Sequence, residues 1–293
     1  MKKILRILFL GVCWAGLLQS CSTLHNPLKI KDYIEIETSE GNFVVGLYEG
    51  TPAHRDNFME KCNSHLYDEK PMYKAIRKSE YSFGLRNGYE ENSVLQTDLI
   101  NNATLPAEFN GKIIPKRGTI AMKRLEGSQN PYKKSDDNLF FLIDGGKNLS
   151  IHEIKASVAL KNRDTYKLYI DEFLTHPENK PYKDSLDALN NMKTMKQYNE
   201  VYARIMKKVK PQIEKDGVEL FSISEKNIDK YLENGGVPMF EGFYTVFGEI
   251  VVGIDILDKF SKIETNLDRQ PIKDVSIIST AVLKKKDFKK KYK

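Results

Sequence analysis

The sequence predicts a mainly β body into which a helical segment is inserted. Residues 31–49 alternate apolar and polar side chains on both sides of Glu40-Gly41-Asn42, which is typical of a β-hairpin with a tight turn. Residues 244–250 and 275–280 also have strand character, whereas the apolar residues of 148–235 recur at helical spacing. The 293 residues, 40% hydrophobic and 29% charged, suffice for one large folded domain or two small ones.

The N-terminus has the features of an export signal. Lys2, Lys3 and Arg6 precede an apolar run from residue 7 to 18, which is too short for an ordinary membrane span. Leu18-Gln19-Ser20-Cys21 follows and resembles a bacterial lipobox. We therefore expect a leader over 1–20, an acylated Cys21, a tether over 21–30 and a membrane-anchored protein of the cell envelope, facing the periplasm or the cell surface. The alternative is a plain signal peptide with an incidental cysteine.

Charge is concentrated at the C-terminus. The formal net charge is +6, and three of these charges belong to the predicted leader, so the balance gives no reason to expect nucleic-acid binding. Residues 284–293 form a lysine-rich tail that could contact anionic lipid or an acidic partner. A solvated, frayed terminus is the preferred interpretation.

The helical segment spans residues 148–235, and Pro177, Pro181 and Pro211 interrupt it. Its apolar and aromatic positions follow a helical period, as expected for the inside face of a helical hairpin rather than for a ligand site. They are Tyr166, Tyr169, Ile170, Phe173, Leu189, Met192, Met195, Tyr198, Val201, Tyr202, Ile205 and Val209.

Several blocks occur in one order along the chain: the first hairpin with the helix after it, which ends in Asn57-Phe58, then Leu105-Pro-Ala-Glu-Phe-Asn110, Phe140-Phe141 and Tyr244-Thr-Val-Phe-Gly-Glu249. Together they resemble the cyclophilins, which are peptidyl-prolyl cis-trans isomerases, and especially the secreted lipoprotein members of bacteria. The resemblance implies a closed eight-stranded β-barrel capped by two helices, built from residues 31–147 and 236–283. Residues 148–235 would then be a helical insertion.

Prolyl isomerisation has a barrier of roughly 20 kcal/mol. Lowering this barrier requires no nucleophile, metal or cofactor. It needs an apolar pocket for the proline ring and a donor that stabilises the twisted imide. Cyclophilins use an arginine on a strand, and in Met72-Tyr73-Lys74-Ala75-Ile76 the arginine position holds Lys74. A lysine keeps the charge but loses the planar fork of donors.

The next family block can be aligned in two registers. Without a gap it falls on Ser79-Glu80-Tyr81-Ser82, which would destroy the pocket. Four residues later it falls on 83–88, which places Phe83 in the pocket and Arg86 beside it as a second catalytic candidate. The second register is preferred because it gives Phe83 a role.

The resemblance assigns the rest of the pocket to positions that are mostly apolar. Leu139 replaces a family glutamine, and Phe140 is expected in the barrel core. The other pocket candidates are Met122, Phe141, Phe240 and Tyr244. The five histidines form no pair at helical ligand spacing, so no metal site is expected. No cofactor is expected either, because prolyl isomerisation needs none.

Three functions remain open at this point. The leading one is a monomeric isomerase of weak activity that acts on proline-containing or unfolded clients among exported proteins. The second is a non-catalytic proline-peptide-binding or chaperone-like lipoprotein that has kept the barrel. In the third, the helical segment is the functional part and the barrel is its platform.

Overall fold

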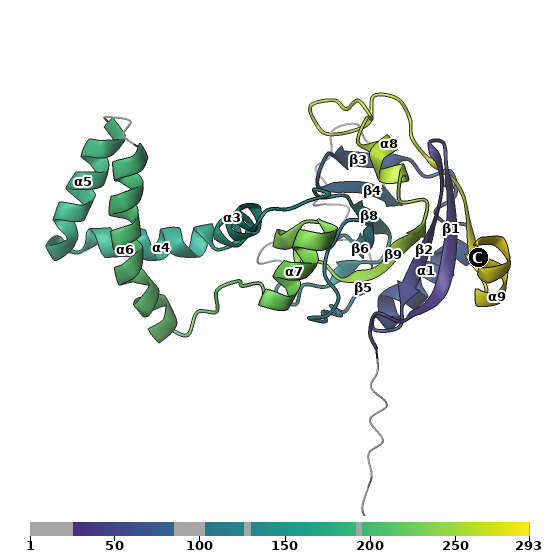
Figure 1. Cartoon of the computed structure of the whole chain (residues 1–293), viewed down its shortest axis with the longest axis horizontal. Helices are drawn as coiled ribbons and strands as arrows, with labels where there is room; N and C mark the ends of the chain where they lie inside the picture. The colour runs from purple at the N-terminus through teal and green to yellow at the C-terminus, as the bar shows by residue number, and fades with distance from the viewer. Residues whose placement is uncertain (1–25, 85–102, 126–129, 192–194, 293) are drawn as a thin grey trace, which may run out of the picture.

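The computed structural model describes residues 26–84, 103–125, 130–191 and 195–292. Its main body is one antiparallel eight-stranded sheet that curls around a core, in the order β10-β1-β2-β9-β6-β8-β4-β3 (Figure 1). The strands are β1 (Ile30–Thr38), β2 (Gly41–Tyr48), β3 (Met72–Ile76), β4 (Glu80–Gly84), β6 (Thr119–Met122), β8 (Leu139–Ile143), β9 (Val246–Val252) and β10 (Ile277–Leu283). A separate pair consists of β5 (Thr104–Leu105) and β7 (Ser135–Asp136).

The first hairpin follows the predicted alternation. In the pairing of β1 with β2, Ile30 lies opposite Tyr48 at one end and Thr38 lies opposite Gly41 at the other. Gly41 has a φ of 138° at the turn. Ile34 and Ile36 point inward and are fully buried. Alternation of this kind fixes the register, because a slip of one residue would turn the isoleucines to solvent.

The edges of the sheet meet over a short stretch only. Between β3 and β10 the described residues form an isolated bridge at Pro71 and Ser276. The amide of Met72 donates to Val275 O at 2.7 Å, and the amide of Ile277 donates to Lys70 O at 2.9 Å. The sheet is therefore a curled, partly closed barrel, where the resemblance implied a fully closed one.

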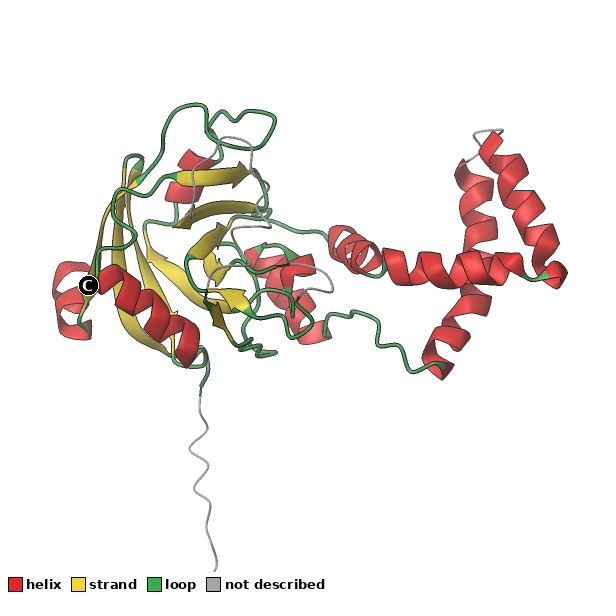
Figure 2. Cartoon of the chain, turned by 180° about the vertical axis from the view of Figure 1, so that it is seen from behind, coloured by secondary structure: helices red, strands yellow, loops and turns green. Residues whose placement is uncertain are grey.

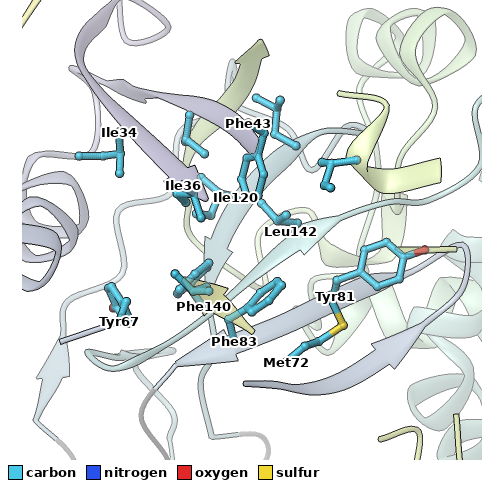
Figure 3. Close-up of a cluster of buried hydrophobic side chains, with 14 of the residues drawn as sticks. Ile34, Ile36, Phe43, Tyr67, Met72, Tyr81, Phe83, Ile120, Phe140 and Leu142 are labelled. Carbon is cyan, nitrogen blue, oxygen red and sulfur yellow. The ribbon is translucent and has the colours of Figure 1, made fainter. Parts of the chain in front are cut away.

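Two helices close the core, as expected. α1 (Pro52–Asn63) contributes Phe58 and Cys62, and α8 (Ile256–Phe260) contributes all of its apolar side chains to the same cluster. Eight of the 23 buried residues of this core are aromatic, and Figure 3 shows Phe83 and Phe140 side by side within it. The rings of Phe83 and Phe140 stack with their centroids 5.6 Å apart.

The segment between β8 and β9 is helical, as the period predicted. It contains α3 (Ile151–Lys161), α4 (Arg163–Thr175), η2 (Pro177–Asn179), α5 (Lys180–Asn191), α6 (Met195–Lys215), α7 (Glu225–Asn234) and η3 (Pro238–Phe240). α4, α5 and α6 project away from the barrel (Figures 1 and 2) and bury a core of their own. That core includes Ile170, Val201, Ile205 and Val209 from the predicted stripe, whereas Met195 is exposed.

α3 and α7 instead pack against the barrel. Ile154 of α3 and Tyr231 of α7 form one cluster with Ile114, which precedes β6. The two ends of the helical segment also meet, because Gly146 and Gly236 form an antiparallel bridge. A Cβ at Gly235 would lie 1.7 Å from the Gly146 carbonyl oxygen, so this approach requires glycine.

The C-terminus differs from the expected frayed tail. Residues Lys285–Tyr292 form α9, and Phe288 is buried against Tyr33 of β1 with ring centroids 3.9 Å apart. Phe288 and Tyr292 are four residues apart and so lie on one helix face, which explains how a lysine-rich segment is held. Within the described ranges, no helix is both long and apolar enough to span a bilayer.

Candidate active site

The strand registers place one row of residues on the outer face of the sheet. Lys74 lies opposite Ser82, Ser82 opposite Phe141, and Phe141 opposite Ala121. Residues paired directly across antiparallel strands point to the same face. Lys74 and Phe141 are thus on one face and two strands apart, a backbone separation of about 10 Å.

Three of the proposed pocket residues come together on this face. The Phe141 ring meets Tyr244 edge-on at 5.0 Å and Phe240 at 5.9 Å, and Phe240 meets Tyr244 at 5.0 Å between centroids. They belong to a cluster of outward-facing apolar residues that also contains Ala121 and Val246. We call Phe141, Phe240 and Tyr244 the aromatic cluster.

The structure does not bring the other pocket candidates to the aromatic cluster. Phe83 pairs with Phe140, and Phe140 with Met122, in the neighbouring row that faces the barrel interior. Strand alternation separates the two rows, so Phe83 and Met122 are core residues. Leu139 is buried in a different group with Tyr73.

The structure does not give Phe83 the pocket role that the preferred register of the 79–88 block assigned to it. β4 runs from Glu80 to Gly84 and pairs continuously with β8, which puts Glu80 and Ser82 on the outer face and Phe83 inside. Gly84 ends the strand with a φ of 128°, where a Cβ would lie 2.2 Å from Asn138 O. Arg86 lies outside the described residues, as does Cys21.

A lysine that the sequence analysis did not consider covers the aromatic cluster. The Lys123 ammonium lies 4.3 Å from the centroid of the Phe141 ring and 5.9 Å from that of Tyr244. It forms an ion pair with Glu80, and the side chains are only 13% and 5% exposed. Phe141 has no exposed surface. The Lys123 ammonium therefore covers the face of the buried Phe141 ring.

Within the described residues, Lys74 forms no ion pair with Glu80. Its side chain is half-buried, and it lies opposite Ser82, whose hydroxyl is 3.5 Å from Glu80 Oε1. The cation closest to Phe141 is thus Lys123 rather than Lys74. Alternation could have identified it, because Ala121 pairs with Phe141 and Lys123 follows two residues later, directly after the end of β6.

Comparison with known proteins agrees with this fold. The family model for "Cyclophilin type peptidyl-prolyl cis-trans isomerase/CLD" matches residues 33–156 and 170–282. This chain belongs to the cyclophilin family. Among solved structures, a cyclophilin-type isomerase of Cryptosporidium parvum matches with a TM-score of 0.44 and 13% identity, over 86% of this chain and 98% of that chain. The same protein in the presence of the dipeptide Ala-Pro matches with a TM-score of 0.43 and 13% identity, over 86% and 99%.

In this cyclophilin an open cavity lies next to the closed aromatic cluster. It has a volume of about 440 Å³ and shares Tyr244 with the cluster. One wall is barrel surface, including Ile113 and Val246, and the other includes Leu220 and Phe221 from the extended chain between α6 and α7. Its volume lies within the range of about 300–1,000 Å³ found for ligand sites.

The helical segment holds the loop that carries Phe240 and Tyr244. Asn227 and the Tyr231 hydroxyl of α7 donate to the two carboxylate oxygens of Glu241 at 2.7 and 2.9 Å. Burial raises the pKa of Glu241 despite these hydrogen bonds. From α3, the Lys161 ammonium lies 3.3 Å from the Phe243 ring centroid. The loop therefore depends on helices that the sequence analysis assigned to an insertion.

A buried network beside the cavity includes Ser135, His54 and Glu108. His54 Nε2 is 2.9 Å from the Ser135 hydroxyl, and His54 Nδ1 is 2.6 Å from Glu108. Glu108 also accepts the backbone amides of Ala53 and His54 at 3.0 Å. Burial opposes its ionisation, but the hydrogen bonds outweigh it and lower the pKa of Glu108.

The network has the Ser-His-carboxylate connectivity of a catalytic triad, but a substrate cannot reach it. Ser135 is 1% exposed and His54 is fully buried. Its effect is to fix the N-terminus of α1 against the segment that precedes β6. Among the described residues, no group of three or more His, Cys, Asp or Glu side chains is arranged to hold a metal ion.

Proposed function

We propose that this cyclophilin is a lipid-anchored protein of the cell envelope that binds unfolded segments of exported proteins. In this proposal its isomerase activity is low, because Lys123 closes the proline site. The observation that carries the proposal is the complete burial of Phe141 beneath the Lys123 ammonium. A catalyst for prolyl rotation must seat the ring in an apolar slot, and here a charged group fills that slot.

The open cavity supports binding without catalysis. Its walls combine apolar side chains with charged ones such as Glu108, Lys133 and Lys161, so it suits an extended polypeptide better than a purely apolar ligand. Phe109 on its rim is 42% exposed and can contact a client side chain. Because both the barrel and the chain after α6 line the cavity, a bound segment would contact both.

The second candidate is an active isomerase, as in the leading expectation from the sequence. The observation that favours it is the assembled aromatic cluster, which needs only the departure of Lys123 to become a slot. The Lys123 side chain is 13% exposed, so it is not completely enclosed by the protein. In this version Lys74 supplies the cation, although it has neither the fork of arginine nor a position beside Phe141.

Two measurements on the mature chain separate these functions. A protease-coupled assay with a proline tetrapeptide reports turnover, and exchange broadening between the cis and trans NMR signals of the same peptide reports bound-state rotation. We expect peptide binding with turnover near background. Turnover at the level of an active cyclophilin, reduced by Phe141→Ala, would contradict the proposal and establish the isomerase.

The envelope location is proposed from the N-terminal sequence alone. The anchor would be supported if the chain is labelled by a fatty-acid probe and Cys21→Ser abolishes this labelling. A cleaved chain that carries no lipid would leave a secreted protein. The mature chain is proposed to be a monomer, which light scattering in detergent can test. Failure of either point would not alter the argument about Phe141.

A further inference from the structure

The C-terminal helix α9 concentrates positive charge on a docked element. Lys284 and five lysines within the helix are all exposed, and Asp287 is the one acidic residue among them. Only Lys291 forms an ion pair, with Glu35, among the lysines of residues 284–292. Lys286 and Lys290 lie four residues apart, on the face opposite Phe288.

This helix would not form by itself. Eight residues are too few for a stable isolated helix, and like charges at i and i+4 oppose one. Three contacts with β1 hold it: Phe288 stacks on Tyr33, and the Tyr292 hydroxyl and the Lys291 ammonium donate to Glu35 at 2.5 and 2.7 Å. The barrel therefore presents these lysines on a fixed surface instead of leaving them on a loose tail.

The helix lies where the chain enters the barrel. Ile30, the first residue of β1, packs in the same cluster as Phe288 and Tyr292. The register of β1 with β10 brings Tyr33 opposite Leu283, two residues before α9 begins. A tether over residues 21–29 spans at most about 30 Å when fully extended. A lipid at Cys21 would therefore keep α9 close to the bilayer.

We infer that α9 is a docking surface for anionic phospholipid headgroups. The lysines supply the complementary charge, and the helix geometry spreads them over a surface instead of a point. The location argument rests on the proposed anchor at Cys21, whereas the charge and docking of α9 do not. Contact with the bilayer would fix the barrel relative to the membrane, in addition to the tether.

The experiment uses the chain without residues 1–20 and with Cys21→Ser, which keeps every described element and carries no lipid. Its sedimentation with phosphatidylethanolamine vesicles containing phosphatidylglycerol is compared with that on pure phosphatidylcholine, at about 0.1 M and about 0.5 M salt. The test variant replaces Lys285, Lys286, Lys289 and Lys290 with Gln. The matched control makes the same change at four exposed lysines of α6, namely Lys207, Lys208, Lys210 and Lys215.

We expect binding to the phosphatidylglycerol vesicles that weakens with salt. A lysine close to an anionic surface strengthens binding about fivefold, so the α9 variant should bind roughly 100-fold less tightly, after allowance for incomplete contact. The α6 control should bind like the parent chain. Equal losses in both variants, or no preference for the anionic vesicles, would overturn the inference. Loss of binding to polyglutamate in the α9 variant, with vesicle binding intact, would also overturn it and indicate an acidic polypeptide partner.

Discussion

Replacement of Lys123 by Ala tests the closed site most directly. The change removes the ammonium from the face of Phe141 and leaves the Glu80 carboxylate, which is 5% exposed, without its cation. Loss of one partner from a buried ion pair costs about 3 kcal/mol at the lower end of the usual range. For a chain of this size we expect the melting temperature to fall by about 6–12 °C.

The same interaction sets how rarely the wild-type site opens. If the pair and the ring contact together hold Lys123 in place by about 3 kcal/mol, about one molecule in 100 has an open slot. Binding of a proline peptide to the slot is weakened by the same factor. Lys123→Ala should therefore strengthen slot binding by up to about 100-fold and raise isomerase turnover by at least about tenfold.

Two further variants separate stability from access. In the double variant Lys123→Ala with Glu80→Gln, the unpaired charge is gone, so most of the lost stability should return and yield a coupling energy of about 2 kcal/mol. Lys61 is the matched control, because it pairs with Asp137 at 3.0 Å and has a similarly low exposure of 12%. Lys61→Ala should lower stability and leave peptide binding and turnover unchanged.

The assays are urea unfolding, peptide titration followed by NMR, and protease-coupled turnover. The account of Lys123 as a cover would be refuted if Lys123→Ala folded well and still bound no proline peptide at Phe141. A fall in turnover below that of the parent chain would refute it in another way. Lys123 would then be a working cation of the site.

Three smaller predictions follow from burial and backbone geometry. The pKa of Glu108 is lowered in the folded state, so the ionised carboxylate stabilises the fold above its unfolded pKa of about 4.3, and this stabilisation is lost as pH falls through the folded pKa. Urea unfolding of Glu108→Gln at acid pH should therefore show a weaker dependence of the unfolding free energy on pH. Gly84→Ala should cost about 2–3 kcal/mol in urea unfolding because its Cβ would meet Asn138 O, whereas Gly111→Ala, with open space around it, should change little. Burial raises the pKa of Cys62 to about 12, so iodoacetamide should label this thiol, by mass spectrometry, only after unfolding.

Local patterns predicted the strands better than they predicted the site. The hairpin of residues 31–49 could be recognised because buried Ile34 and Ile36 alternate with polar neighbours, and alternation is what a half-buried strand requires. The helical segment was equally visible from its period. The closure of the barrel was not, because pairing between Pro71 and Ser276 depends on contacts far apart in sequence.

The choice of register for the 79–88 block shows why pocket residues are harder to predict. An aromatic residue at position 83 suggested a pocket role, but Phe83 is an equally good core residue, and composition cannot tell the two faces of a strand apart. Strand parity can do so once one partner is known. If Phe141 faces outward, then its partner Ser82 does as well, and Phe83 must face the core.

The site also depends on groups to which the sequence analysis gave no role. Glu80 is the first residue of β4, Lys123 directly follows β6, and the two side chains meet beside Phe141. Two buried opposite charges would each be costly alone, but as a pair they satisfy one another. Lys123 and Glu80 therefore depend on each other, and a chain that had only one of them would have an unpaired buried charge. In the proposed closed site, this mutual dependence makes the closed state a property of Lys123 and Glu80 together rather than of either residue alone.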